Sequence, residues 1–218
     1  MLFGSAAKHA KQHYSGSDDL DRAYFRDYIH FPCLDGFVTT IDGAGTIEAC
    51  GNLLLMTTGN VTNNDVVISH NYNYHIKPKT SVEHCIYLSQ SITNVDAYLI
   101  TCHQKLTAPP VVADNDYWGF KISNGSIFAI NCDDGSETST DTGIDRAAAT
   151  NYITTMKTFI DYSNIKFYVN GILKATHTTN IPSMGVAYPH LILRTKDDVA
   201  KIYRFGRIAI SINMTNFG

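Results

Sequence analysis

Short runs of strand-forming residues recur along the chain from Phe31 onward, and turn-forming residues separate them. Residues 37–41 end at a glycine-rich turn, and residues 53–57 form a continuous apolar run of strand length. The segments that predict strands are 37–41, 53–57, 61–69, 82–88, 97–102, 118–122, 127–131, 152–160, 165–169, 173–177, 191–195 and 207–212. No helical pattern alternates with them, so the sequence predicts an all-β, antiparallel sandwich rather than a parallel α/β sheet.

An Asn-Gly pair at residues 170–171 predicts a β-hairpin, and side-chain parity indicates the length of its loop. Asn-Gly usually forms a two-residue type I′ loop, which would pair Phe167 with Lys174 and mix apolar and charged residues on each face. A three-residue loop ending at a left-handed Gly171 pairs Phe167 with Leu173 instead. The apolar face then consists of Ile165, Phe167, Leu173 and Ala175, with Lys166, Tyr168, Lys174 and Thr176 opposite. We therefore predict a three-residue loop with a G1 bulge at Gly171.

The same parity argument applies to a second Asn-Gly hairpin and to the last strand. A three-residue loop ending at Gly125 places Trp118, Phe120, Ile122, Phe128 and Ile130 on one face. In the last strand Ile208, Ile210 and Ile212 share a face, with Arg207, Ala209 and Ser211 on the other. Tyr203 and Phe205 have the wrong parity for the isoleucine face, so we predict a bulge or bend at Gly206.

Residues 6–29 differ from the rest, because they are the most charged stretch and hold few β-branched residues. Leu20, Tyr24 and Tyr28 fall at the spacing of one helical face. We expect residues 1–30 to form a short, partly helical or extended N-terminal arm, and residues 31–218 to form the sandwich domain. The arm is interpreted either as a lid packed on the sandwich or as a segment that docks on a partner.

Composition limits the partners of the chain. Of 218 residues, 44% are hydrophobic and 17% are charged, so a sizeable core is possible and much of the surface is uncharged. The net charge of −3 argues against nucleic acid held by phosphate contacts. Neither a signal peptide nor a membrane span is evident.

The five cysteines are Cys33, Cys50, Cys85, Cys102 and Cys132. They form no CxxC pair and predict reduced thiols in a protein that folds in a cytoplasm; Cys85 and Cys102 are expected on neighbouring strands.

Several segments resemble a known fold family. The hairpin at residues 165–177 resembles one common in concanavalin A-like (laminin G-like) jelly rolls, and residues 203–210 are similar to the final strand of that fold. Residues 118–122, 127–130 and 137–144 also resemble modules of tailed-phage and prophage structural proteins. The resemblance spans residues 31–213 and implies a two-sheet jelly roll. Its functional implication is broad, because the fold hosts lectins, glucanases, adhesion modules and virion parts.

Candidate catalytic residues are sparse. Related glucanases carry their carboxylates on one strand as Glu-x-Asp-x-x-Glu, a spacing suited to retaining chemistry. Here Glu48 and Glu83 are isolated on their predicted strands, and Glu137 is expected in a loop. Ser69 and His70 are adjacent but lack a nucleophile elbow. We therefore expect no catalytic residues, and predict that the chain is not an enzyme.

Binding residues are also hard to assign from the sequence. Residues 132–137 with Asp141 are the densest acidic cluster, but they match no EF-hand loop and are interpreted as a solvated turn. His84 and His103 could lie on adjacent strands, yet their spacing does not predict zinc. The aromatic residues considered for a sugar platform are Tyr72, Tyr74, Tyr117 and Trp118, of which Trp118 is assigned to the core. No metal and no cofactor are expected, and the ligand-binding residues stay unknown.

The function that these patterns favour is structural. We predict a non-catalytic virion structural or decoration protein, a homo-oligomer that folds in the host cytoplasm and docks on capsid or other virion proteins through its arm and its sandwich surface. The alternative is a lectin-like carbohydrate-binding module or receptor-binding head that holds a glycan. A third reading, an inactive hydrolase relative, differs from that alternative only at the missing carboxylates.

Overall fold

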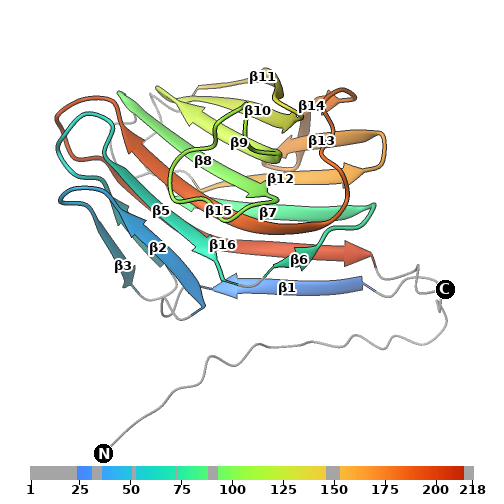
Figure 1. The fold of residues 1–218 in the computed structure, drawn as a ribbon, viewed down its shortest axis with the longest axis horizontal. Coiled ribbons are helices and arrows are strands. Elements are labelled where there is room, and N and C mark those ends of the chain that lie inside the picture. Colours follow the sequence, from blue (N-terminus) through green and yellow to red (C-terminus); the bar gives the residue numbers. More distant parts are fainter. Residues whose placement is uncertain are drawn as a thin grey trace, which may run out of the picture.

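The structure is a computed structural model, and it shows a β-sandwich (Figure 1). It describes residues 24–30, 36–50, 53–71, 73–87, 93–145 and 153–213. These residues form sixteen strands and no helix, and every strand pairing among them is antiparallel. Within the same ranges there is accordingly no apolar helix of membrane-spanning length. The predicted all-β antiparallel sandwich is confirmed.

Sheet A is built around the long C-terminal strand. In spatial order it contains β14 (Ile172–His177), β13 (Asn164–Val169), β12 (Ile153–Asp161), β7 (Thr80–Tyr87), β16 (Ile202–Asn213), β4 (Leu53–Thr57) and β3 (Thr46–Cys50). A further strand, β1 (Tyr24–His30), pairs with the C-terminal half of β16 (Figure 1). Sheet A therefore joins segments from both ends of the described chain.

Sheet B contains the remaining strands. Its spatial order is β11 (Ser136–Asp145), β10 (Ser126–Asp133), β9 (Tyr117–Ser123), β8 (Val95–Cys102), β15 (Val186–Thr195), β5 (Asp65–His70) and β2 (Phe37–Ile41). The two-residue strand β6 (Tyr74–His75) also pairs with β15. All twelve segments that the sequence predicts as strands overlap a strand, whereas β1, β3, β6 and β11 were missed.

The strand β1 corrects the helical interpretation of its residues. Tyr24 and Tyr28, expected on one helical face, belong to a strand whose register runs from Tyr24 opposite Asn213 to His30 opposite Arg207. Pairing with the free edge of β16 supplies backbone hydrogen bonds that a local pattern cannot foresee. Leu20 and the rest of residues 1–23 lie outside the described residues, so the predicted arm is assessed only over β1.

The core between the sheets is apolar and includes several large aromatic rings. Phe120 of sheet B meets Phe167 of sheet A edge-to-face, with 5.6 Å between ring centroids. Trp118 has no exposed surface, which confirms its assignment to the core. Burial of such side chains is the main favourable term that holds two sheets together.

A second apolar layer lies on the outer face of sheet B. It consists of Val67, Ile100, Cys102, Leu106, Tyr117, Ile130, Cys132 and Ile192, with Tyr98 and Phe128 packed against it. Leu106 lies on the segment between β8 and β9 and packs against the outer side of the sheet. Strands β8, β9 and β10 are therefore apolar on both faces, and side-chain parity alone cannot identify their inner side.

Both Asn-Gly loops have two residues, so the predicted three-residue loops are wrong. Ser123 pairs with Ser126 across the first turn, and Val169 pairs with Ile172 across the second. The Asn and Gly of each turn have positive φ, from 47° to 90°, which is the type I′ geometry. In the first hairpin Phe128 and Ile130 lie on the outer layer instead of the inner core.

The second hairpin restores its buried face with a bulge beyond the turn. Tyr168 pairs with Leu173 and Phe167 with Ala175, so Lys174 is the extra residue between these pairs. Ile165, Phe167 and Ala175 are buried as predicted, but Leu173 lies beside Tyr168 and is 49% exposed. The sequence thus correctly predicted a bulge in this hairpin, but it placed the bulge at Gly171 instead of at Lys174.

The bulge predicted at Gly206 is confirmed. The register between β16 and β7 shifts between Phe205 and Ile208, so that Phe205 is buried on the same inner side as the isoleucines that follow. A Cβ atom on Gly206 would lie 2.7 Å from Cε2 of Tyr87 and 3.3 Å from Sγ of Cys85. Glycine is favoured there because a side chain would displace the Tyr87 ring and crowd Cys85 on the neighbouring strand.

Candidate functional site

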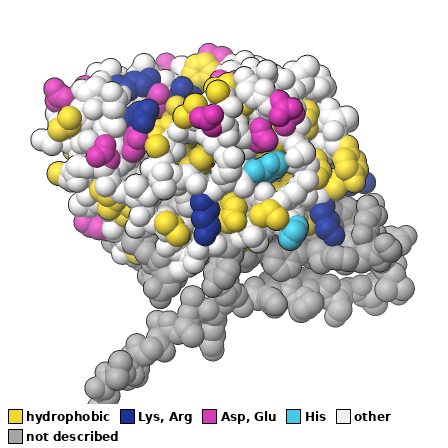
Figure 2. Space-filling model, in the orientation of Figure 1, with side chains coloured by type: hydrophobic (Ala, Val, Ile, Leu, Met, Phe, Trp, Pro, Cys, Tyr) yellow, Lys and Arg dark blue, Asp and Glu magenta, His cyan; other side chains and the backbone are white. Residues whose placement is uncertain are grey.

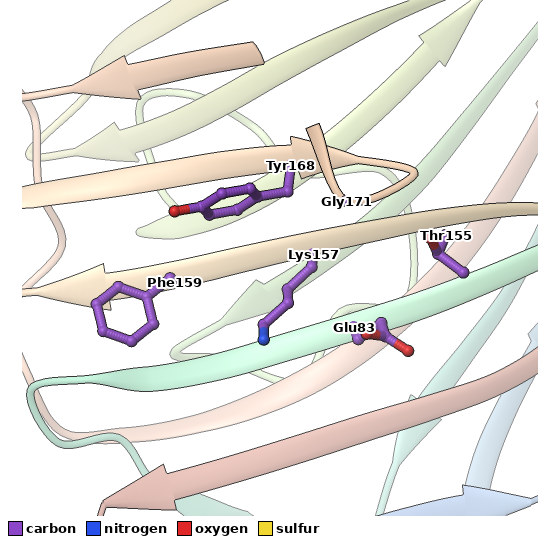
Figure 3. Close-up of a pocket in the computed structure, with 6 residues that line it drawn as sticks. All are labelled: Glu83, Thr155, Lys157, Phe159, Tyr168 and Gly171. Carbon is purple, nitrogen blue, oxygen red and sulfur yellow. The ribbon is translucent and has the colours of Figure 1, made fainter. Parts of the chain in front are cut away.

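A groove lies on the outer face of sheet A, the face turned away from sheet B, and Figure 3 shows the side chains around it. It is lined by Glu83, Thr155, Lys157, Phe159, Tyr168 and Gly171. Its volume of about 330 Å³ is at the small end of the range typical of ligand sites. The lining comes from the neighbouring strands β7, β12 and β13 and from the turn after β13.

Strand alternation explains why these side chains meet. Along β12, Met156 and Ile160 point into the core, so Lys157 and its neighbours two residues away point outward. The register places Lys157 directly opposite Glu83 on one side and Tyr168 on the other. One row across the sheet therefore carries an aromatic ring, an ammonium group and a carboxylate.

The Glu83 carboxylate is fixed by the next strand. Nη2 of Arg207 donates a hydrogen bond to Oε1 of Glu83 at 3.0 Å, and both side chains keep contact with solvent. Arg207 reaches this position because the bulge at Gly206 resets the parity of β16. The ion pair leaves Glu83 oriented and partly neutralised rather than free.

The turn at the end of the groove is tied to β12. The backbone N–H of Asn170 donates to the carbonyl oxygen of Thr155 at 2.8 Å, and the N–H of Thr155 donates to Oδ1 of Asn170 at 3.0 Å. These two bonds hold the turn, and with it Gly171, against β12. The groove is therefore bounded by elements with fixed register.

The groove combines two half-buried aromatic rings with hydrogen-bonding groups. Phe159 and Tyr168 offer apolar ring surface, and Lys157, Glu83 and the Thr155 hydroxyl can donate or accept. A glycosidase of the two-carboxylate type needs carboxyl groups about 5–9.5 Å apart. Among the described lining residues Glu83 is the one carboxylate.

The aromatic residues proposed from the sequence lie elsewhere. Tyr74, Tyr117 and Trp118 are buried, and Tyr72 is outside the described residues. Burial raises the pKa of the Tyr117 hydroxyl, and the hydrogen bond that this hydroxyl donates to Glu137 raises it further. The sequence did not single out Tyr168 as a binding residue. The feature that could have done so is that Tyr168 is a single aromatic residue on an otherwise polar strand face.

Ser69 does have a histidine partner, but it is His190 rather than the adjacent His70. Oγ of Ser69 lies 2.8 Å from Nδ1 of His190, and Nε2 of His190 lies 2.9 Å from the Gln104 carbonyl oxygen. Both side chains are buried. The hydroxyl also lies 2.9 Å from the carbonyl oxygen of Leu106, so the pair holds the segment after β8 on sheet B.

The cysteines and histidines expected on neighbouring strands are separated. Cys85 and His84 belong to β7 in sheet A, whereas Cys102 ends β8 in sheet B and His103 follows it. Cys85, Cys102 and Cys132 are free and buried, and burial raises the pKa of the Cys102 thiol to about 11. The side chains of Cys33 and Cys50 are outside the described set.

The acidic segment contains the predicted solvated turn, since Asp134 and Gly135 form an exposed turn between the paired residues Asp133 and Ser136. Glu137, however, lies on β11 rather than in a loop, contrary to the prediction. Oδ1 of Asp141 accepts a hydrogen bond from the N–H of Gly143 at 2.8 Å. In the described part of the chain no three His, Cys, Asp or Glu residues gather as metal ligands. Figure 2 shows acidic and basic side chains mixed over the visible face.

No protein-family model and no curated protein sequence matches the chain. Solved structures do resemble it. A protein of unknown function from Shewanella oneidensis MR-1 has 11% identity and a TM-score of 0.63, with 89% of each chain covered. The β-glucanase of Bacillus licheniformis has 14% identity and a TM-score of 0.62, covering 86% of this chain and 98% of that one. A variant of LamA from Zobellia galactanivorans, in complex with laminaritriose and laminaritetraose, has 10% identity and a TM-score of 0.62, covering 88% and 99%.

These similarities identify the fold as a concanavalin A-like jelly roll, which confirms the predicted fold and its resemblance. They also correct one expectation. The prediction that the chain is not an enzyme is overturned, because glycoside hydrolases recur among the similar structures. The botulinum neurotoxin serotype D binding domain shares the fold as well. Nothing in these similarities supports a phage origin, so the virion role, its partners and its location stay predictions.

Proposed function

We propose that this protein binds a glycan in the groove on the outer face of sheet A. The observation that carries the proposal is the row of Tyr168, Lys157 and Glu83, with Phe159 beside it. A sugar ring has apolar C–H faces and polar hydroxyl edges. The two aromatic rings would cover a C–H face, while the ammonium, the carboxylate and the Thr155 hydroxyl would bind hydroxyl groups.

The preorganisation of the groove supports this role. Glu83 is held by Arg207 at 3.0 Å, and the turn at Asn170 is fixed to Thr155 by two hydrogen bonds. Groups that are already oriented lose little conformational entropy when a ligand binds. The similar structure of LamA with bound laminari-oligosaccharides adds an analogy of fold, since a related sandwich accommodates a glycan.

The test is a tyrosine substitution with a matched control. Tyr168→Ala should weaken binding of a glycan identified on an array by about tenfold or more, because losing one aromatic contact of ~1.4 kcal/mol changes Kd tenfold. Tyr162→Ala removes a tyrosine that is 73% exposed in the turn between β12 and β13 and does not line the groove. Titration calorimetry on both variants, each checked for unchanged melting temperature, gives the comparison.

Equal loss in the two tyrosine variants, or full binding by Tyr168→Ala, would contradict the proposal. The proposal concerns binding, and cleavage is a separate measurement on the same mixtures. Release of new reducing ends from β-glucan oligosaccharides, compared between the natural protein and Glu83→Gln, reports whether the bound glycan is also hydrolysed. Binding without Tyr168 would locate the glycan on another surface.

A further inference from the structure

We infer that the groove selects an anionic glycan, one whose rings carry carboxylate or sulfate groups. This inference rests on the proposed glycan-binding function and names the class of sugar. Its basis is the balance and pairing of charges on the outer face of sheet A. Around the groove, Lys157, Lys166 and Arg207 are cationic, and Glu83 is the carboxylate among the described lining residues.

Among the described residues, none forms an ion pair with Lys157, the cation at the centre of the groove. Glu83, the nearest carboxylate in the register, forms its ion pair with Arg207. On sheet B the pattern differs, since Lys121 and Lys196 both pair with Asp96. Lys157 therefore keeps a positive charge that an incoming anion can meet.

A second cation extends the positive region. Lys166 lies on β13 directly opposite Phe159, one row away from Lys157. It too has no ion-pair partner among the described side chains. The two lysines flank the Phe159 ring, so a sugar stacked on that ring would present its acidic substituent to one of them.

The half-buried position of Lys157 makes its charge more effective than that of a fully exposed lysine. Its side chain lies beside the rings of Tyr168 and Phe159, with its ammonium directed toward β7 (Figure 3). Bulk water screens a charge in such a recess less than on open surface. A charge-assisted hydrogen bond to a carboxylate or sulfate is stronger than one to a hydroxyl group.

The experiment compares two ligands that share the same backbone and differ only at C6 of each ring, where one carries a carboxylate and the other a neutral hydroxymethyl group. Tetragalacturonate and its carboxyl-reduced form are titrated into the full chain, beside an array of neutral, uronate-containing and sulfated oligosaccharides. We expect the acidic glycans to bind about tenfold more tightly or better than their neutral counterparts at low ionic strength, as for hydrogen bonds to charged groups. That preference should fall as salt is added.

Substitutions then separate this inference from the proposed function. Lys157→Gln should remove the preference for the acidic glycan and its salt dependence, whereas Lys105→Gln, which removes a charge from the segment after β8, should leave both unchanged. A neutral glycan that binds as well as its acidic form, and is lost in Tyr168→Ala, overturns the inference and keeps the function. Failure of every glycan on the array to bind overturns both.

Discussion

At the residue scale, the buried histidines pack inside the fold and also limit the pH range over which the folded protein is stable. His84 points into the core and is 2% exposed, and its Nδ1 atom has no hydrogen-bond partner in the described structure. Burial lowers the pKa of His84 to about 3. Burial also lowers the pKa of His190 to about 4, although the hydrogen bond to Gln104 acts in the opposite direction. Both rings are therefore neutral in the folded protein at mildly acidic pH.

These pKa shifts predict acid sensitivity. Below pH 6.5 the unfolded chain binds protons that the folded chain excludes, so the free energy of unfolding falls as the pH drops toward 4. Between pH 7.5 and 5.5 the two histidines together should cost about 3 kcal/mol, from 1.36 kcal/mol per pKa unit for each. Urea denaturation at the two pH values measures the loss.

A substitution identifies the groups responsible. His84→Met should remove about half of the loss expected from His84 and His190 together, whatever it does to the stability at pH 7.5. His75→Gln, at an exposed position on β6, is the matched control. A pH dependence that is the same in His84→Met and in the natural protein would show that His84 does not contribute.

At the level of elements, the two-residue turns set the register of the hairpins around the site. Asn170 and Gly171 have φ values of 50° and 78°, and the turn they form is bonded to Thr155 of β12. Asparagine tolerates left-handed backbone better than most residues, and glycine has no penalty there. The choice of turn therefore places Tyr168 beside Leu173 on the outer face and leaves Lys174 as the bulged residue.

Replacing Gly171 should measure the free energy of its left-handed backbone conformation separately from any steric clash. A Cβ atom on Gly171 meets nothing within 4 Å, so Gly171→Ala should destabilise the protein by about 1–2 kcal/mol through backbone conformation alone. Gly185 is also free of neighbours around its Cβ position, and its φ is not in the left-handed range. Gly185→Ala should be neutral or slightly stabilising in the same denaturation experiment, and equal effects would refute the assigned turn.

At the scale of the whole molecule, sheet A and sheet B are joined by the aromatic contact between Phe120 and Phe167. The ring centroids are 5.6 Å apart at an interplanar angle of 89°, and both rings are fully buried. Phe167 also packs 4.6 Å from the ring of His177 on β14. The outer face of sheet A, which carries the groove, thus depends on packing that lies behind it.

A double-mutant cycle tests that inter-sheet contact. Phe120→Ala and Phe167→Ala should each cost about 3–5 kcal/mol, and the pair should show a coupling of about 0.5–1.5 kcal/mol. Phe128 packs against the outer layer of sheet B, so a cycle between Phe128 and Phe167 should be additive within about 0.5 kcal/mol. Additivity in the first cycle would mean that the two rings contribute separately.

The sequence by itself determined the local features whose causes are local. Alternation and β-branched runs located twelve strands, parity required the bulge at Gly206, and the apolar environment of Trp118 excluded it as a binding platform. These follow from the pleat of a strand and from the exclusion of apolar side chains from water. The all-β class followed from the same pattern.

Tertiary structure alone decided the features that depend on strand pairing. The second apolar layer makes β9 and β10 apolar on both faces, so side-chain parity predicted the wrong length for the loop between them. Similarly, β1 is a strand because its backbone pairs with the C-terminal half of β16. The groove exists because β7, β12 and β13 are neighbours, although Glu83 and Tyr168 are 85 positions apart in sequence. Which distant side chains become adjacent is set by the register of the whole sheet, and no local pattern contains that information.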